Sequence, residues 1–252
     1  MRDGILAALK EIERAQEVRV LLAVESGSRA WGFASPDSDF DVRFVYVHPR
    51  NWYLSVFDAR DVIEKMLPGD LDVSGWELRK SLRLFSKCNL AFNEWLGSPI
   101  RYVHEPRFLE QLEALLPRYF NPIAGLHHYR RMAAAALDDS LRDGAVGIKK
   151  LFYVLRPLLA CRWIRNVRAQ PPTEFAKLVD TGWVTGEERA WIEDLLALKA
   201  AAAEAQTIPL EPARVAALRE EIDGHEAAGT QMTFHKPADD AALDELLRAW
   251  VV

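Results

Sequence analysis

The alternation of hydrophobic and polar positions near the N-terminus predicts one helix followed by two strands. Residues 3–16 carry apolar side chains at helical spacing and charged side chains on the other faces, so this helix should pack on a sheet. The apolar run 18–24 is typical of a buried strand. After a turn signal at residues 35–38, the segment 39–47 alternates polar and apolar residues and predicts a second strand.

Further along, the pattern changes from mixed to helical. Residues 58–66 predict a short helix, and a third short strand is expected at 70–73, after the break at Pro68 and Gly69. From about residue 106 the strand signal nearly disappears. Helices are predicted at residues 77–85, 90–96, 106–116, 121–142, 146–168, 173–180, 186–205, 211–227 and 238–250.

These elements predict an α+β fold with two domains. A small mixed-sheet domain is expected at residues 1–105, and an α-helical domain that closes a cleft over it is expected at residues 106–252. A length of 252 residues suits one or two domains, and 50% hydrophobic with 27% charged residues is an ordinary globular composition.

Charge and hydropathy argue against two classes of partner, long nucleic-acid duplexes and membranes. A formal net charge of −5 gives no general electrostatic footprint for nucleic acid and argues against a long duplex as substrate. A short RNA end remains compatible, because Arg162, Arg165 and Arg168 could form a local basic patch. No run reaches the roughly 20 apolar residues that span a bilayer, so we expect a cytoplasmic protein without a membrane partner.

Candidate chemistry begins where the first strand ends. The run 18–24 leads into Glu25, Ser26, Gly27 and Ser28. Glycine allows a tight backbone turn, and the serines offer hydroxyl and N–H donors. Such groups hold phosphate oxygens, so the sequence predicts a phosphate-binding turn here.

The second strand predicts a metal site beside this turn. Successive side chains on a strand point to opposite faces, so Asp39, Asp41 and Arg43 share one face. Two neighbouring carboxylates repel unless something neutralises them, and a divalent metal does so. Mg²⁺ is the natural candidate, because it takes one or two protein carboxylates and completes its shell with water and phosphate oxygens.

This arrangement resembles the signature of the nucleotidyltransferase superfamily of DNA polymerase beta, a Gly-Ser turn followed after a spacer by Asp-x-Asp on a strand. The wider wording of residues 27–43, G-S-R-A-W-G-F-x-S-x-x-S-D-x-D-V-R, is similar to bacterial predicted nucleotidyltransferases of the RNA repair pathway DNA polymerase beta family. Segments 72–80, 93–100 and 149–158 are similar to the same family. Together the resemblance covers residues 18 to 165.

The resemblance implies a polymerase β-like palm domain and metal-dependent transfer of a nucleoside monophosphate. The donor would be an NTP, with ATP expected, and pyrophosphate would be released when an acceptor hydroxyl attacks. By this resemblance, the catalytic residues are Asp39, Asp41 and Asp72. Asp39 and Asp41 would bind two Mg²⁺ ions, or Mn²⁺, and Asp72 would complete the shell of the catalytic ion. Asp70, beside Gly69, is better explained as a turn residue.

The nucleotide contacts start at the turn. Gly27 and Ser28 would hold the β- and γ-phosphates, and Arg43 would support a phosphate or orient a carboxylate. Lys80 follows Asp72 closely enough to reach a phosphate, although a solvated lysine is an equally good interpretation.

A second set of nucleotide contacts is predicted in the helical region. Lys149, Tyr153 and Arg156 are spaced as one stripe of a helix. A cationic stripe opposite metal-bound carboxylates suits a triphosphate, whereas the alternative is a solvated basic stripe. The family resemblance favours triphosphate contact.

The acceptor stays open at this stage. An RNA end is implied by the narrower family, but a protein hydroxyl, as in AMP-transferring antitoxin-like enzymes, or a small molecule would use the same metal chemistry. A catalytically idle, nucleotide-binding sensor is the alternative from another class. A contiguous basic groove beside Asp72 would favour RNA, and an enclosed acidic pocket would favour a cationic small molecule. Base preference and oligomeric state are not fixed by the sequence.

Overall fold

The computed structural model describes residues 1–35, 38–201 and 206–251, and the chain divides into two compact units. The sheet unit consists of Met1–Trp31, Asp39–Tyr119 and Lys236–Val252, and the helical unit of Gly32–Ser38 and Phe120–His235. Pro36 and Asp37 of the predicted turn, and residues 202–205 of a predicted helix, lie outside the described residues. No helix within the described ranges is long and apolar enough to cross a membrane.

The sheet unit contains most of the strands. Its elements are α1 (Arg2–Gln16), β1 (Arg19–Glu25), α2 (Gly27–Trp31), β2 (Phe40–Val47), α3 (Arg50–Tyr53), β3 (Val62–Leu67), β4 (Leu71–Glu77), α4 (Leu78–Ser86), α5 (Leu90–Leu96), β5 (Arg101–His104), α6 (Pro106–Tyr119) and α12 (Ala241–Trp250).

The helical unit contains the remaining elements. They are α7 (Pro122–Ser140), β6 (Ala145–Gly147), α8 (Ile148–Val167), α9 (Phe175–Val179), α10 (Gly186–Ala201), β7 (Thr207–Pro209) and α11 (Pro212–Gly229).

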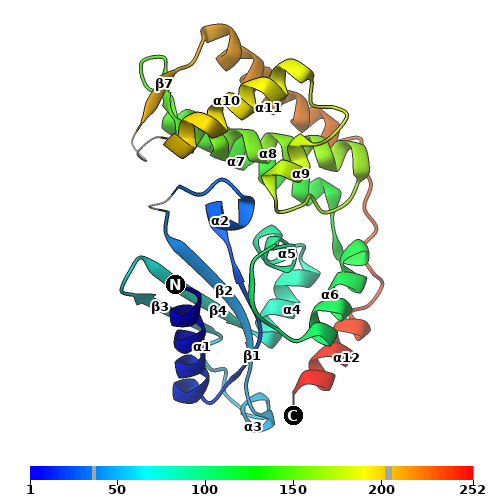
Figure 1. Cartoon of the computed structure of the whole chain (residues 1–252). Coiled ribbons are helices and arrows are strands. Elements are labelled where there is room, and N and C mark those ends of the chain that lie inside the picture. The colour runs from blue at the N-terminus through cyan, green and yellow to red at the C-terminus, as the bar shows by residue number, and fades with distance from the viewer. Residues whose placement is uncertain (36–37, 202–205, 252) are drawn as a thin grey trace. The chain divides into compact units, whose positions relative to one another are not determined.

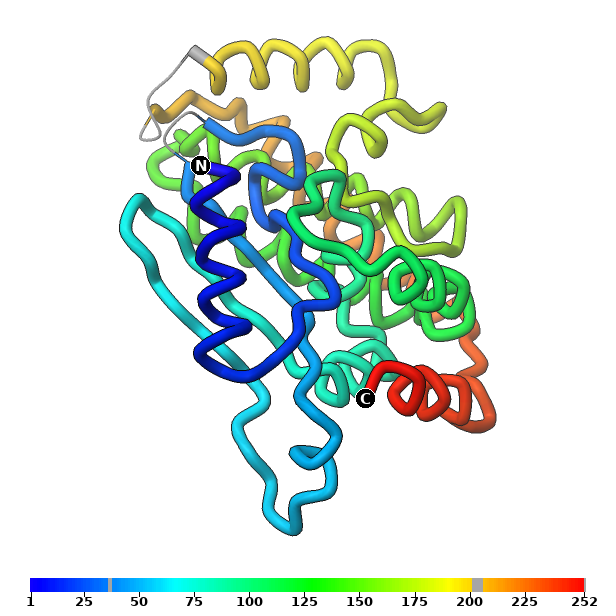
Figure 2. Tube along the Cα trace, turned by 60° about the horizontal axis from the view of Figure 1, so that its bottom comes forward, coloured from blue at the N-terminus to red at the C-terminus, as the bar shows by residue number. Residues whose placement is uncertain are grey.

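A five-stranded mixed sheet forms the centre of the sheet unit. Its order is β3-β4-β2-β1-β5, in which β2 and β4 run parallel and the other neighbours run antiparallel. Helix α1 lies along one face through Ile5, Leu9 and Ile12 (Figures 1 and 2). The other face packs against α4, α5, α6 and α12. This architecture confirms the predicted α+β fold, with a mixed-sheet part and a helical part.

The alternation along β2 decides which face carries the polar groups. Val42, Phe44 and Tyr46 are fully buried in the core beneath α1. Asp41 and Arg43 alternate with them and therefore project from the opposite face. That face is covered by α4 and α5 farther along the strands, so the polar cluster lies at the end of the sheet that these helices leave open.

Two parts of the sheet unit differ from the sequence prediction. Residues 58–66 were expected to include a helix, but Val62–Leu67 forms β3 and pairs antiparallel with β4. The cause is a tight hairpin, in which Gly69 and Asp70 adopt φ angles of 82° and 54°. Strand β5 was not predicted, and it pairs with β1 at the sheet edge.

The division into units also differs from the expected boundary after residue 105. Helix α6 packs on the sheet, and α12 returns to it from the C-terminus. The Trp250 Nε1–H donates to Gln111 Oε1 at 2.9 Å, and the Trp250 ring meets Phe108 edge-on with centroids 5.5 Å apart. Such contacts between distant segments have no local sequence signal.

A short N-terminal segment belongs to the helical unit. Gly32–Ser38 connects the Gly-Ser turn to β2, and its Phe33 ring lies 5.1 Å from Phe152 and 5.5 Å from Phe175, centroid to centroid. Lys199 Nζ donates to Ser35 Oγ at 2.7 Å. The spacer within the family-like motif is thus anchored among the helices.

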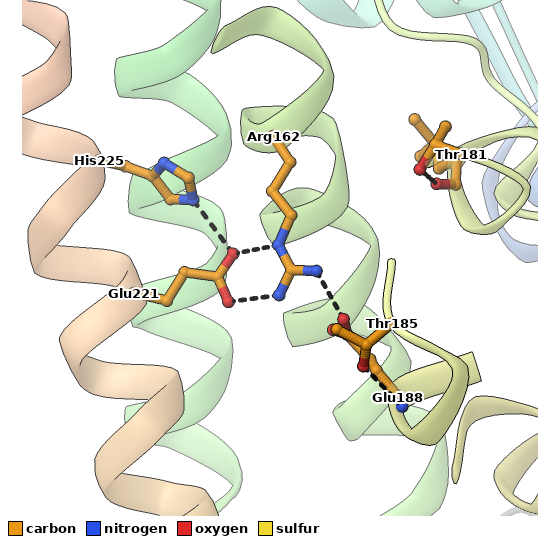
Figure 3. Close-up of polar contacts among 7 residues, drawn as sticks. Arg162, Thr181, Thr185, Glu188, Glu221 and His225 are labelled. Atoms are coloured by element: carbon orange, nitrogen blue, oxygen red, sulfur yellow. Dashed lines mark hydrogen bonds and ion pairs between the residues drawn. The ribbon is translucent and has the colours of Figure 1, made fainter. Parts of the chain in front are cut away.

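Three helices of this unit are joined by an ion-pair network (Figure 3). Arg162 donates two parallel hydrogen bonds to Glu221, at 2.6 and 2.7 Å, and a third to Glu188 at 2.7 Å. His225, whose side chain is fully buried, places Nε2 3.3 Å from Glu221 Oε1. The network links α8, α10 and α11, so the Arg162 guanidinium is engaged by two carboxylates rather than serving as part of a local basic patch.

Candidate active site

Asp41 and Asp72 occupy matching positions on the neighbouring parallel strands β2 and β4. Arg43 bridges them, because its Nη2 lies 3.0 Å from Asp41 Oδ1 and 2.8 Å from Asp72 Oδ2. The two carboxylate side chains are about one third exposed, at 33% and 34%. The structure therefore brings three predicted site residues into one solvent-accessible cluster, in which the cation offsets the repulsion between the carboxylates.

The Gly-Ser turn lies directly against Asp41. Gly27 has a φ of 61°, and a β-carbon on it would lie 2.4 Å from Asp41 Oδ2. The Ser26 N–H donates to the Asp41 carbonyl oxygen at 2.8 Å, which ties the turn to β2. Ser28 is buried in the short helix α2 that follows. Glycine is required here both for the left-handed backbone and for the close approach.

Asp39 precedes β2 at an exposed position, two residues before Asp41. Its carbonyl oxygen accepts a hydrogen bond from Arg29 Nε at 3.0 Å, and the Arg29 guanidinium lies 3.7 Å from the centre of the Phe40 ring. Arg29 was not identified from the sequence, and it fixes the backbone that carries Asp39.

Glu25 is a second residue that sequence reasoning missed. Its side chain is fully buried, Oε1 accepts the Asp41 N–H at 2.8 Å, and Oε2 accepts the Tyr102 O–H. Burial raises the pKa of Glu25 above its usual value, and the hydrogen bonds from Tyr102 and Asp41 oppose this rise. The available signal was a charged residue that ends an apolar strand immediately before the Gly-Ser turn. Glu25 holds the backbone of a candidate metal ligand.

Lys80 lies away from the carboxylate cluster. It follows β4 on helix α4, at the opposite end of the strand from Asp72, and its Nζ pairs with Asp61 Oδ1 at 3.0 Å. Because a strand rises about 3.3 Å per residue, the five residues from Asp72 to Glu77 already span roughly 17 Å. This placement does not support the predicted phosphate contact.

The predicted stripe on α8 divides into two kinds of residue. Arg156 is 1% exposed, and its Nε and Nη2 donate to the Thr173 carbonyl oxygen at 3.3 and 3.2 Å. It therefore stabilises the interior of the helical unit, and the predicted phosphate contact has no support at this position. Lys149 and Tyr153 are half-buried on the same helix, and their contact with a triphosphate stays a prediction.

The donor atoms suit a magnesium ion that is shared with a substrate. In the described part of the chain, no three His, Cys, Asp or Glu side chains are grouped closely enough to hold a metal by themselves. Mg²⁺ needs only one or two carboxylates and fills the remaining positions with water and phosphate oxygens. Asp41 and Asp72 provide such a pair, and a cavity of about 430 Å³ beside Asp72 leaves room for the other ligands.

Comparisons with known proteins show which family the chain resembles. The sequence model of the RNA repair pathway DNA polymerase beta family (RlaP) matches residues 1–249. A protein of Bacillus subtilis (strain 168), named Uncharacterized protein YcgL, is 48% identical over 199 residues, which cover 79% of this chain and 76% of that protein. The match extends over both compact units, so the helical unit is part of what the family shares.

Proposed function

Because the chain belongs to the RNA repair pathway DNA polymerase beta family, we propose that it is a metal-dependent nucleotidyltransferase. It transfers a nucleoside monophosphate from an NTP, with ATP as the expected donor, to the hydroxyl of an RNA end and releases pyrophosphate. The observation that carries the proposal is the pairing of Asp41 and Asp72 on parallel strands, beside a glycine turn packed against Asp41.

In this proposal, Asp39 and Asp41 would bind two Mg²⁺ ions, or Mn²⁺ in their place, and Asp72, at the matching position on β4, would complete the shell of the catalytic ion. Bound ions of this kind stabilise the charge on the attacking and leaving oxygens of a phosphoryl displacement. Arg43 has a complementary role: it neutralises the carboxylate pair and is positioned to turn toward a phosphate oxygen, which its planar guanidinium matches.

The residues of the turn position the nucleotide. Gly27 has no side chain, so the backbone can approach the β- and γ-phosphates closely, and Ser28 adds its hydroxyl. The acceptor hydroxyl attacks the α-phosphorus in line, a new phosphorus–oxygen bond forms, and the bond to the bridging oxygen of the β-phosphate breaks. Asp72 is the carboxylate assigned to receive the proton of the hydroxyl. Lys149 and Tyr153 would contact the triphosphate.

The choice of an RNA end rests on the family and is compatible with the charges near Asp72. The cavity is lined by two cations, Arg43 and Lys65, and by two carboxylates, Glu64 and Asp72. It is therefore neither a contiguous basic groove nor an acidic pocket. The described lining is therefore not the acidic pocket that a cationic small molecule would need. An uncharged or zwitterionic part of an acceptor suits these balanced charges better.

The test is an incubation with each of the four NTPs, labelled at the α-phosphate, together with Mg²⁺ or Mn²⁺, a pool of RNA ends and cell lysate. RNA and protein are then separated. Label in RNA supports the proposal. Label in protein indicates an AMP-transferring enzyme, and label in neither fraction, with nucleotide binding retained, indicates a small-molecule acceptor or an idle sensor.

A further inference from the structure

The cavity beside Asp72 is lined in part by two tryptophans, Trp76 and Trp95, which the proposed phosphate chemistry does not use. It lies at the end of the sheet face that α4 and α5 leave open, and its lining includes Arg43, Asp72, Ser74, Trp76 and Trp95. Its volume is about 430 Å³. This is within the usual range of ligand pockets, about 300–1,000 Å³.

The positions along β4 show where Trp76 lies relative to Asp72. Asp72, Ser74 and Trp76 alternate along β4 and share one face, opposite Leu71 and Val73 in the buried core. At about 3.3 Å per residue, Trp76 begins roughly 13 Å along the strand from Asp72. The carboxylate and the indole thus belong to opposite ends of one cavity on one strand.

A second tryptophan supports the first. Trp95 comes from α5, is 5% exposed, and packs against Trp76 with ring centroids 4.0 Å apart and an angle of 34° between the planes. Trp76 is half-buried, so part of its ring borders the cavity. Rigid indoles that border a cavity provide a flat, apolar surface for another flat ring.

We propose that this cavity receives the nucleobase at the acceptor end of a single-stranded RNA, stacked on Trp76. The inference rests on the proposed transferase function and adds the recognition of its acceptor. Stacking on an aromatic side chain engages the uncharged face of a base, and Arg43 and Lys65 in the same lining are cations that could contact the phosphates beside it. Stacking also tolerates any base, because every base has a π-face.

The order of the strands favours the acceptor over the NTP as the source of this base. Across the sheet, the Gly27 turn follows β1, Asp41 lies on β2, Asp72 on β4, and the cavity extends to β3. The phosphate-binding turn and the cavity therefore flank the carboxylate pair on opposite sides. A triphosphate on the β1 side leaves the β3 side for the group that attacks.

The test measures binding of a fluorescently labelled single-stranded RNA of about ten nucleotides by anisotropy, with Mg²⁺ and without NTP, so that no transfer occurs. Trp76→Leu should weaken binding about tenfold or more, and Trp76→Phe should restore most of it. Trp52→Leu is the matched control, because Trp52 stacks on His48 beyond the other end of β2 and should bind RNA as the wild type does.

Because Trp76 also packs on the core, Trp76→Leu could weaken RNA binding by destabilising the fold, so a second variant is needed. Ser74→Leu adds bulk to the cavity without removing a core side chain and should weaken RNA binding as well. Unchanged binding in both variants, with wild-type melting curves, overturns the inference. Weakened binding of a non-hydrolysable ATP analogue but not of RNA overturns the assignment to the acceptor.

Transfer assays on the same proteins separate this inference from the proposed function. If the wild type transfers label to RNA, and Trp76→Leu does so with an unchanged KM for RNA, only the cavity assignment fails. If the wild type transfers nothing while Trp76→Leu still impairs RNA binding, the transferase proposal fails and the RNA-binding cavity stands.

Discussion

A β-carbon on Gly27 would lie 2.4 Å from Oδ2 of Asp41, so the turn after β1 and the carboxylate on β2 leave no room for a side chain between them. The Ser26 N–H and the Glu25 carboxylate hold the backbone of Asp41 from the same side. The Gly-Ser turn and the candidate metal ligand Asp41 are therefore coupled, so a shift of one should shift the other.

Gly27→Ala should abolish most of the nucleotide transfer. The new methyl group must push the Asp41 carboxylate aside, and a misplacement of about 1 Å can reduce a catalytic rate about 100-fold. The left-handed φ of 61° adds roughly 1–2 kcal/mol of backbone strain. Gly144→Ala is the matched control, because Gly144 has a φ of 76° and no atom within 4 Å of the added carbon. Equal activity of the two variants would contradict the assigned role of the contact.

Arg43→Ala should destabilise the metal-free protein and increase its response to metal. Without the guanidinium, Asp41 and Asp72 repel each other, and since all three side chains are partly exposed the loss should be about 1 kcal/mol. Mn²⁺ then has no competing cation, so it should raise the melting temperature more in the variant than in the wild type. A smaller shift in Arg43→Ala would contradict this competition and show that Arg43 holds the two carboxylates in the geometry that the metal needs.

Replacing Glu25 should change how stability depends on pH. Its pKa is raised above 4.5 by burial, so between 4.5 and the raised folded value the native state binds more protons than the unfolded state. Stability from this group is therefore lost as pH rises through that window. The difference in unfolding free energy between wild type and Glu25→Gln should fall as pH rises from about 4 to 7. A difference that stays constant between pH 4 and 7 would contradict this role of the buried carboxyl group.

The ion-pair network of the helical unit predicts the opposite pH dependence. Burial raises the pKa of Glu221, but the hydrogen bonds from Arg162 and His225 outweigh it and lower the value to about 2. The resulting stability is present above pH 4.5 and is lost as pH falls toward 2. Glu221→Gln should cost about 2 kcal/mol near pH 7, somewhat below the usual loss for a fully buried pair, and little at acid pH.

Glu226→Gln provides the comparison for this network. Glu226 Oε1 accepts a hydrogen bond from Arg130 Nη2 at 3.3 Å, and the Glu226 side chain is 60% exposed. Exposed pairs contribute about 0–1 kcal/mol, so this variant should unfold almost as the wild type does. Similar losses of unfolding free energy in Glu221→Gln and Glu226→Gln, measured by urea unfolding, would show that the network stabilises the protein no more than an exposed ion pair does.

Local patterns predicted the strands that carry the candidate site. Alternation along residues 39–47 placed Asp41 and Arg43 on one face, and the structure agrees because a strand's side-chain direction depends only on its own backbone. Choosing Asp72 as the partner required the family resemblance. Asp70 has a φ of 54° in the hairpin, as expected of a turn residue. Which strands become neighbours is a property of the topology, and the sequence pattern does not contain it.

Sequence reasoning could not show where Arg156, Lys80 and residues 58–66 lie in the fold. The periodicity of α8 identified Arg156 as part of a stripe but could not show that the backbone of Thr173 covers it. Lys80 is only eight residues from Asp72 in the sequence, but the two lie far apart in space because most of the intervening residues form an extended strand. The sequence pattern of residues 58–66 predicted a helix, but Val62–Leu67 forms a strand because it pairs with β4. For Arg156 and for residues 58–66, a contact with a more distant segment decided the outcome, whereas for Lys80 the length of the extended strand did.

The most direct test of the central claim is nucleotide transfer by Asp41→Asn, Asp72→Asn and Asp70→Asn, assayed with the α-phosphate-labelled NTP and acceptor that the wild type uses. Each substitution removes one negative charge at constant size, and asparagine also tolerates the left-handed backbone of Asp70. We predict that the first two variants lose transfer by at least about 100-fold while keeping the wild-type melting temperature within a few degrees, and that Asp70→Asn retains activity. Wild-type turnover in Asp41→Asn or Asp72→Asn would contradict the account.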